Sequence, residues 1–453
     1  MLTTLRRHPR YARLFAAQLS GLLGTGVLTV ALALLAADLA GPRAAGVLAT
    51  AMTVKIVAYV VLSPWIARLT AGWAPVRVLV GADVVRVAVA ASLPLVDATW
   101  QVYALVLVLQ AASAGFTPAY QALLPRVLPE EGDYRQALSL SRVAYDAEAV
   151  VSPAVAALAL VLVDARSLFL LSAVGFVSSL TWVLAARPPA AATPAGGREE
   201  RSGGFMAFVR VPDLRRLLLL DLVAACAYAS ALVLTATLVA DVGWGEPEVG
   251  VVLAVFGAGS VVGAVLVSRW AGEPWAPMCW GAGLVALTLL VAAVVGGGGA
   301  GLVVTWAVLG LGSSLVLTPS GQVLRAQGEG RRLTLLFAGH FAWSHACYLL
   351  TYPLAGLVAV QTSAPAGPRR PGRARRRRPR RGTAPPPRPL PPVCVGPHPN
   401  RLRPPQTCGL SARLRGAPRK RARVERVERV AGLGRGRPAR RPLRDPGYDT
   451  MTT

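Results

Sequence analysis

Long apolar segments alternate with short polar connections through the first 360 residues of the chain. Each segment is close to the roughly 20 residues that a helix needs to cross the hydrocarbon core of a bilayer. A soluble protein has no use for such a series. The pattern predicts an all-α polytopic membrane protein whose eleven readable spans cover residues 13–37, 44–68, 76–97, 101–125, 135–163, 166–187, 215–240, 247–269, 276–298, 300–323 and 334–360.

The two halves of this apolar region repeat one another. Four positions around the first span recur 203 residues later around the seventh: Pro9, Arg13, Gln18 and Asp38 correspond to Pro212, Arg216, Asp221 and Asp241. Four matches in one register indicate a duplicated bundle whose halves run in the same direction. Parallel repeats of six helices are the plan of one large transporter class, in which substrate is handled between the halves near the midplane.

Domain boundaries follow from this plan. Residues 1–187 are predicted to form a six-helix bundle, and residues 188–205, rich in Pro, Ala, Gly and charge, a cytoplasmic linker. Residues 206–360 hold the five readable spans of a second bundle, and residues 206–216 are expected to form a short interfacial helix. The twelfth helix that a duplicated six-helix plan demands is missing from the readable pattern.

Charge is distributed very unevenly along the chain. The formal net charge is +26, but residues 361–453 hold 25 of the 48 Lys and Arg residues and only four of the 22 acids. In the preceding connections, eighteen Arg residues lie on the side of the N-terminus and two, Arg43 and Arg166, on the opposite side. The positive-inside rule therefore predicts a multi-pass protein of the plasma membrane with a cytoplasmic N-terminus.

The basic tail, residues 361–453, does not fit this topology, because eleven spans from a cytoplasmic start would place it outside. It is composed mainly of Arg, Pro, Gly and Ala, which predicts disorder. We interpret it as out-of-frame translation after a frameshift near residue 360 that replaced the twelfth helix. The alternatives are a solvated extension of a natural eleven-span protein and an authentic tail that binds nucleic acid or anionic lipid through Arg.

The chain offers little sign of enzyme or cofactor chemistry. None of the five Cys residues pairs with another at metal-ligand spacing, and no disulfide framework is readable. There is no Gly-rich phosphate loop, no zinc-type His-Glu spacing and no soluble catalytic domain. We therefore expect neither an enzyme nor a cofactor, and no resident metal.

Four stretches of the chain follow the motif pattern of one known family of membrane proteins. Residues 63–86 lie where that family carries its loop signature between helices two and three, including its downstream Asp-x-x-Arg. Residues 116–125 (FTPAYQALLP) and 128–131 (LPEE) resemble the end of helix four and the following loop. Residues 152–157 resemble the Gly-Pro-x-x-Gly-Gly element of antiporter helix five, with small residues in place of Gly. In these stretches the chain resembles the major facilitator superfamily, in its multidrug and siderophore exporter-like branch. The resemblance covers about residues 5–360.

The loop signature departs from the family at its centre. Its Asp-Arg pair is replaced by Ala71-Gly72, and Arg77 alone remains of its basic cluster. In the family, that Asp is thought to help gate the bundle on the cytoplasmic side. Its loss puts ordinary gating in doubt or shifts it to other charged positions, for which the candidates are Arg68, Arg77, Asp83 and Arg86.

The resemblance implies a secondary transporter that exports an amphipathic small molecule, drug-like or siderophore-like, in exchange for protons. Its expected partners are the lipid bilayer, a small-molecule substrate and protons, with no nucleic acid, and the chain is expected to be a monomer. Two alternatives stay open. One is export of a metal ion such as nickel or cobalt, and the other is a truncated product without function.

Charged residues within the predicted spans are the first candidates for transport chemistry, because such charges are costly and usually line a cavity or pair. Lys55, the only Lys in the first 360 residues, is either a structural or snorkelling cation or a cavity cation. Arg142 and Asp146 are spaced i, i+4 and can pair. Glu148 is rotated about 200° from Asp146, so the two acids are not expected to serve one site. Asp146 or Glu148 is favoured as proton carrier ahead of Asp221.

Two His residues and several polar residues within the spans remain. His340 and His345 lie five residues apart, about 140° around a helix, which favours cavity-lining or satisfied His residues over a shared metal. Polarity within an apolar span is the only ground for the other candidate substrate contacts, which are Gln110, Tyr120, Gln121, Ser313, Ser314 and Trp343.

Overall fold

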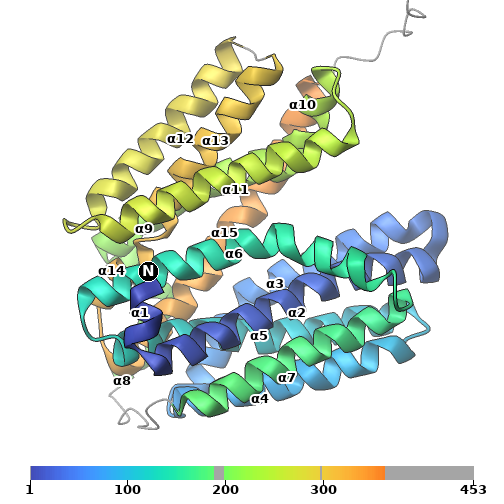
Figure 1. Cartoon of the computed structure of the whole chain (residues 1–453). Helices are drawn as coiled ribbons and strands as arrows, with labels where there is room; N and C mark the ends of the chain where they lie inside the picture. The colour runs from blue at the N-terminus through green and yellow to red at the C-terminus, as the bar shows by residue number, and fades with distance from the viewer. Residues whose placement is uncertain (1, 188–197, 296–297, 363–453) are drawn as a thin grey trace, which may run out of the picture. The chain divides into compact units, whose positions relative to one another are not determined.

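A computed structural model describes residues 2–187, 198–295 and 298–362 of the chain, and all regular structure in these residues is helical. Figure 1 shows the arrangement of the helices. The first half contains a short N-terminal helix, six long helices and three 3₁₀ turns: α1 (Leu2–Arg7), α2 (Pro9–Ala40), η1 (Gly41–Arg43), α3 (Ala44–Thr70), α4 (Pro75–Ser92), η2 (Leu93–Leu95), α5 (Thr99–Val127), α6 (Glu131–Ala159), η3 (Ala165–Ser167) and α7 (Leu168–Ala186).

The second half supplies five membrane-length helical units after a shorter helix. Its elements are α8 (Arg198–Arg210), α9 (Pro212–Ala229), the π-helical turn η4 (Ser230–Leu234), α10 (Thr235–Asp241), α11 (Glu246–Arg269), α12 (Trp275–Val295), α13 (Gly299–Leu317), α14 (Ser320–Ala326) and α15 (Gly330–Thr362). The helices α9 and α10 together form one unit through η4, and α13 and α14 form another. All eleven predicted spans thus coincide with helices.

Proline sets several of the helix starts. Pro9, Pro75 and Pro212 each stand in the first turn of α2, α4 and α9, where a missing N–H costs nothing and the fixed φ suits a helix. Pro9 and Pro212 are a pair in the 203-residue repeat, so the repeat extends to how the two bundles begin. We call the side of the bundle at which α2 begins the N-side, and the opposite side the far side.

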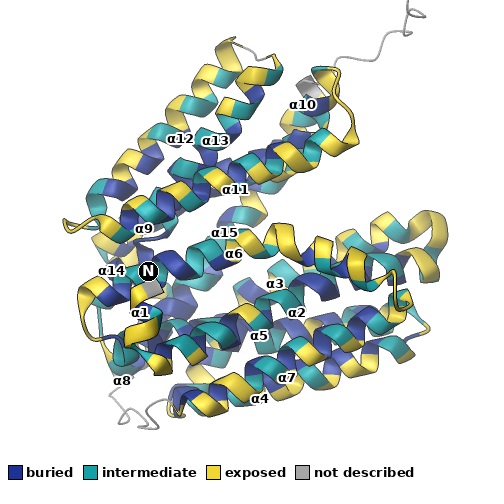
Figure 2. Ribbon diagram, in the orientation of Figure 1, coloured by how far each residue is buried: buried dark blue, intermediate teal, exposed yellow. Residues whose placement is uncertain are grey.

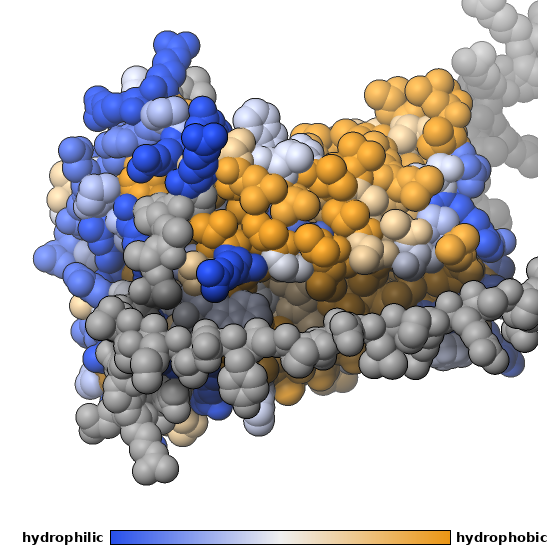
Figure 3. All heavy atoms as spheres, turned by 90° about the horizontal axis from the view of Figure 1, so that it is seen from below, coloured by the Kyte–Doolittle hydropathy of each residue, from blue (hydrophilic) through white to orange (hydrophobic). Residues whose placement is uncertain are grey.

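The membrane character predicted from the sequence is present in the helices. Nine stretches of the described residues are long and apolar enough to cross a membrane, and the first, Pro9–Thr70, contains both α2 and α3. Helix α6 is the predicted span that falls outside these stretches, because it carries charged residues along much of its length. Apolar side chains gather over the middle of the helices, and hydrophilic ones gather at the N-side end, on the left of Figure 3.

Each half has its core along the seams between its own helices (Figure 2). In the first half α2 packs against α3, α6 and α7, and α4 packs against α5 and α7. In the second half α9 packs against α12, α13 and α15, and α11 packs against α13. The largest fully buried side chains include Tyr11, Phe169 and Phe176 in the first half and Phe208 and Phe337 in the second.

Glycine allows α11 and α13 to lie in close contact. A Cβ atom at Gly310 would collide with the carbonyl oxygen of Phe256, and one at Gly259 would collide with that of Ala307. No larger residue would permit these backbone contacts.

The repeat reveals an unfilled place in the second half. Helix α7 packs against α2 and α4, whose counterparts in the second half are α9 and α12. No helix among the described residues fills the corresponding place, and α12 exposes large apolar residues such as Trp280 (75% exposed) and Leu290 (63%). By the repeat, the counterpart of α7 would lie against α9 and α12.

The connection between the halves differs from the predicted one. The expected interfacial helix at 206–216 is instead α8, which ends at Arg210, and α9 follows directly from Pro212. Part of the predicted linker 188–205 is therefore helical. Helix α8 packs against α15, where Phe205 stacks on Trp343 at 4.5 Å between ring centroids and its carbonyl oxygen accepts a hydrogen bond from Trp343 Nε1. The proposed out-of-frame tail lies outside the described residues from residue 363 onwards.

Candidate functional site

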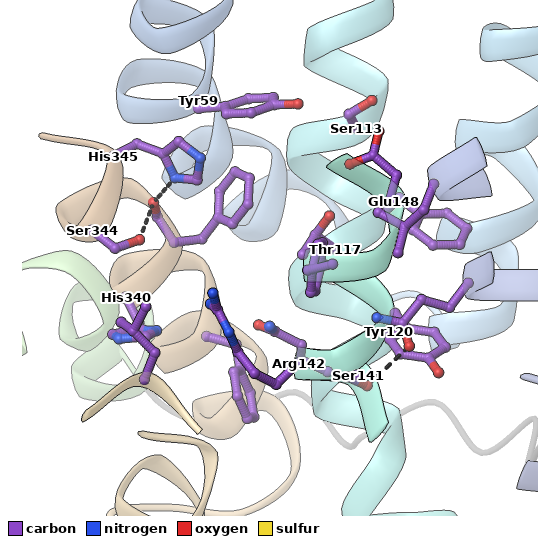
Figure 4. A pocket seen from close by; sticks show the side chains of 18 of the residues that line it. Tyr59, Ser113, Thr117, Tyr120, Ser141, Arg142, Glu148, His340, Ser344 and His345 are labelled. Atoms are coloured by element: carbon purple, nitrogen blue, oxygen red, sulfur yellow. Dashed lines mark hydrogen bonds between the residues drawn. The ribbon is translucent and has the colours of Figure 1, made fainter. Parts of the chain in front are cut away.

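A cavity of about 470 Å³ lies between the two halves. Its wall is built by α2, α3, α4, α5 and α6 of the first half and by α9, α13, α14 and α15 of the second. Labelled side chains such as Tyr59, Tyr120, Arg142 and His345 reach this space from four different helices (Figure 4). The volume is typical of a site for a small organic molecule.

Arg142 and Asp146 form a bidentate ion pair on α6, as their spacing predicted. Arg142 Nη2 lies 2.6 Å from Asp146 Oδ1, and Arg142 Nε lies 3.0 Å from Oδ2. Two hydroxyls of the second half complete the arrangement: Ser260 donates to Oδ2 at 2.5 Å and Tyr228 donates to Oδ1 at 3.2 Å. Each oxygen of Asp146 thus accepts two hydrogen bonds, and the pair joins the halves beside the cavity.

Glu148 lies two residues after Asp146, about 200° around α6 and away from that network. Ser152 Oγ donates to Glu148 Oε1 at 3.3 Å, and the carboxylate packs against Gly26 of α2. Asp146 and Glu148 both line the same cavity, which differs from the expectation that the two acids cannot serve one site. Their hydrogen-bond partners, however, are different residues. Lys55 also lines the cavity, with its Nζ 6.0 Å from the centre of the Tyr59 ring.

Asp221 is a buried member of a second pair. His340 Nε2 lies 2.8 Å from Asp221 Oδ2, and Asp221 Oδ1 has no hydrogen-bond partner among the described residues. His340 lines the cavity, whereas Asp221, only 2% exposed, lies behind it. The repeat relates Asp221 to Gln18, which lines the cavity and accepts a hydrogen bond of 2.9 Å from Ser141 on α6.

His345 is separated from His340, as the helical rotation predicted. Its Nδ1 lies 2.7 Å from the carbonyl oxygen of Phe341, and its ring packs against Tyr59 and Phe341. Both His residues line the cavity but have different partners. Among the described residues no group of three His, Cys, Asp or Glu side chains is placed to hold a metal ion.

The four gating candidates separate into two pairs of different character. Asp83 and Arg86 are buried on α4, where Arg86 Nη1 donates to Asp83 Oδ1 at 3.1 Å and Ser179 donates to Oδ2 at 2.8 Å. Arg86 also borders the cavity. Arg68 and Arg77 are exposed at the N-side ends of α3 and α4. The sequence had grouped all four as equivalents.

The candidate substrate contacts are only partly brought together. Tyr120 and Gln121 line the cavity. Gln110 instead accepts a hydrogen bond of 2.9 Å from Tyr59, and Trp343 packs on α8, so neither borders the cavity. The two Ser residues are buried in α13 away from it: Ser313 and Ser314.

Several residues of the cavity wall are not among the candidates that the sequence predicts. The aromatic part of the wall shares tyrosine and phenylalanine from both halves: Tyr59, Phe116, Tyr145, Tyr228, Phe337, Phe341 and Tyr348. Tyrosines inside apolar spans could have marked this wall, because a buried hydroxyl needs a partner or a cavity. Ser260 carried no such signal, since a single Ser in a small-residue helix is common.

Direct contacts join the two halves near the N-side. Tyr134 donates to the carbonyl oxygen of Gly321 at 3.1 Å, and Arg325 Nη2 donates to that of Pro129 at 2.7 Å. Nearby, Gln322 Nε2 donates to Glu131 Oε1 at 3.3 Å. Ala67 of α3 and Ala71, the residue directly after α3, form a small core with Leu335 and Ala338 of α15. The halves are therefore in contact at the N-side.

Asp133 secures the N-side start of α6 outside the predicted span. His8 Nε2 lies 2.7 Å from its Oδ2, and Thr4 donates to its Oδ1 at 3.2 Å. Burial raises the pKa of the Asp133 carboxyl, but the hydrogen bonds from His8 and Thr4 and the charge of Arg7 outweigh this, so the pKa lies below its ordinary value. The carboxylate is the stable form there.

Comparison with known proteins places this site in a transporter fold. Residues 14–324 match the sequence profile of the Major Facilitator Superfamily. No curated protein matches the sequence. Among solved structures, the human organic anion transporter TETRAN is 14% identical with a TM-score of 0.65, over 78% of this chain and 94% of its own.

Two further solved structures show the same likeness. The Escherichia coli fucose:proton symporter FucP is 13% identical with a TM-score of 0.59, over 78% of this chain and 92% of its own. A bacterial homologue of the iron transporter ferroportin, in an outward-facing state, is 17% identical with a TM-score of 0.58, over 78% and 98%. At these identities the likeness is one of fold.

Proposed function

The chain belongs to the major facilitator superfamily, and from that membership we propose that it is a secondary active transporter of its multidrug and siderophore exporter-like branch. It exports an amphipathic small molecule by alternating access of the central cavity, driven by protons moving inward. Transport of this kind requires a site between two bundles that rock against one another.

The observation that carries this proposal is the network around Asp146. The carboxylate belongs to the first half, two of its four hydrogen bonds come from hydroxyls of the second half, and the network borders the cavity. A change of charge at Asp146 therefore acts on the contact between the halves and on the substrate space together. This is what coupling of an ion to a conformational change requires.

Protons are the coupling ion in this proposal, with Asp146 or Glu148 as carrier ahead of Asp221. Arg142 neutralises the charge of the Asp146 carboxylate through their ion pair. Lys55 is a second cation in the cavity wall. An Escherichia coli structure of similar fold is that of a fucose:proton symporter, which supports protons as the coupling ion. Neutralising the carrier should leave substrate binding and abolish coupling.

The surroundings of the transporter follow from the charge pattern. Eighteen of twenty Arg residues in the connections lie on the N-side, which supports a cytoplasmic N-side in the plasma membrane.

We further propose that the protein acts as a monomer in the bilayer and without nucleic acid, and that the basic tail is an out-of-frame product. Sequencing the gene across the codons for residues 350–375 tests the last point. An apolar run of about 20 residues in another frame supports it.

Efflux from energised cells tests the function. Cells producing the full chain are loaded with a lipophilic fluorescent dye, and its loss is followed with and without a protonophore. We expect the chain to accelerate efflux and the protonophore to remove the acceleration. If the protonophore does not change the accelerated rate of dye efflux, the result counts against proton coupling. No acceleration, with the protein present in the membrane, favours the non-functional alternative.

A further inference from the structure

The acidic groups of the cavity are already engaged within the protein. Both oxygens of Asp146 accept two hydrogen bonds each, from Arg142, Tyr228 and Ser260. Glu148 accepts a hydrogen bond from Ser152 and packs against Gly26. A cationic ligand would therefore have to displace protein donors in order to bind at Asp146.

Two buried donors of residues in the same cavity wall, by contrast, have no partner within the described part of the protein. Arg86 and Tyr120 both line the cavity and are 4% and 3% exposed. Arg86 Nε and the Tyr120 hydroxyl have no hydrogen-bond partner among the described residues. Buried polar groups are normally paired, so two orphaned groups on one cavity wall indicate a ligand that supplies acceptors.

Phe116 holds these two side chains on one wall. The Arg86 guanidinium lies 4.2 Å from the centre of the Phe116 ring, and the Tyr120 ring stacks on Phe116 at 6.2 Å with an angle of 8° between the planes. Asp83, which binds Arg86 Nη1, is fully buried and does not line the cavity. The carboxylate that pairs with Arg86 therefore lies outside the cavity wall, and the Nε–H group of Arg86 has no hydrogen-bond partner among the described residues.

The rest of the wall specifies the body of such a ligand. Lys55 adds an ammonium group to the same cavity, where it lies 6.0 Å from the centre of the Tyr59 ring and interacts electrostatically with Glu148. The aromatic side chains of the wall offer faces for a flat apolar body: Tyr59, Tyr145, Tyr228, Phe341 and Tyr348. A ligand that satisfies both features is an aromatic ring system bearing one anionic group.

We propose that Arg86 and Tyr120 form a subsite for the anionic group of an aromatic organic acid, with Lys55 as a second cation. The proposal deepens the proposed function, on which it rests for the role of the cavity as substrate site. It names the chemical class of the substrate as an organic anion rather than the organic cation that Asp146 and Glu148 would otherwise select.

Binding to the purified full chain in lipid nanodiscs tests the subsite. Three probes share one ring system and differ in charge: 2-naphthoate, 2-naphthamide and 2-naphthylmethylammonium. We expect the carboxylate to bind about tenfold or more tightly than the amide, and the ammonium to bind weakest. Equal binding of all three, absence of carboxylate binding, or preference for the ammonium overturns the subsite.

A pair of Tyr→Phe variants separates the subsite from a structural role. Tyr120→Phe should raise the Kd for naphthoate about tenfold, the ratio expected for one lost hydrogen bond to a charged group. Its melting temperature should be unchanged or higher, because the hydroxyl has no partner in the protein. Tyr11→Phe is the matched control: this buried hydroxyl donates to the carbonyl oxygen of Ala137 and does not line the cavity. It should lower the melting temperature and leave the Kd unchanged.

Lys55→Met provides an independent check of the cation. It should weaken naphthoate binding and leave naphthamide binding unchanged, and an equal effect on both probes contradicts the proposal.

Uptake of each probe into proteoliposomes separates the proposed anion subsite from the proposed transport function. If the ammonium is preferred and transported, the transporter function stands and the anion subsite fails. If the carboxylate binds as expected and none of the probes is transported under a proton gradient of either sign, the subsite stands and the transport function fails.

Discussion

Ser260 on α11 donates a hydrogen bond of 2.5 Å to Asp146 on α6, a residue 114 positions earlier in the chain. The bond crosses from one half of the protein to the other, and Arg142 binds the same carboxylate from its own helix. A single ionisable group thus holds a contact between the halves next to the cavity.

Asp146→Asn should reduce proton-driven export in proteoliposomes at least about tenfold, because the substitution removes the carboxylate that joins the halves and leaves the Arg142 charge without its partner. Asp38→Asn is the matched control, since Asp38 is exposed on the far side in a pair with Arg166. It should transport normally. Unchanged proton dependence in Asp146→Asn eliminates this residue as carrier and moves the test to Glu148→Gln.

Cross-linking the N-side should stop transport, because alternating access requires the halves to separate there. Ser63 of α3 lies against Ala338 of α15, with 3.5 Å between Ser63 Oγ and the Ala338 carbonyl oxygen. In a chain whose own Cys residues have been replaced, Ser63→Cys with Ala338→Cys joined by a short cleavable reagent should lose transport and regain it after reduction. Each single-cysteine variant treated alike is the control. Full activity of the cross-linked protein contradicts a moving N-side.

Stability should depend on Asp133 at acidic pH. Its pKa lies below the ordinary value in the folded protein, so the ionised carboxylate stabilises the fold above its unfolded pKa of about 3.9, and this contribution is lost as pH falls through the lower folded pKa. Between about pH 5 and pH 2 the free energy of unfolding in mild detergent should fall more steeply for the native chain than for Asp133→Asn. Parallel curves would show that the contacts of His8 and Thr4 with Asp133 do not stabilise the fold.

Gly310→Leu should destabilise the second half, because the new side chain would collide with the backbone of α11 at Phe256. Overpacking of this kind typically costs about 1–3 kcal/mol, so a lower melting temperature is expected. The matched control is Gly283→Leu on α12, where an added Cβ meets no atom within 4 Å. Equal melting temperatures for the two variants would contradict the close contact between α11 and α13.

Much of the fold was readable because membrane helices are encoded locally. The length of an apolar run fixes a span, and Pro9 and Pro212 mark where two of them start. The i, i+4 spacing of Arg142 and Asp146 was enough to predict their pairing, since both lie on one helix. The repeat that relates Pro9 to Pro212 could likewise be predicted from the sequence, because it is a constant spacing of 203 residues along the chain.

The partners that give the cavity its character came only from the tertiary structure. Tyr228 and Ser260 reach Asp146 from helices that begin at Pro212 and Glu246, and nothing in their own segments marks them as its partners. The orphaned donors of Arg86 and Tyr120 likewise appear only when the walls around them are placed. The sequence by itself determined which segments span the membrane and which charges they carry, because burial in lipid constrains each segment separately. The tertiary structure decided which of the polar groups have a partner within the described protein and which do not, because that depends on contacts between helices far apart in the chain.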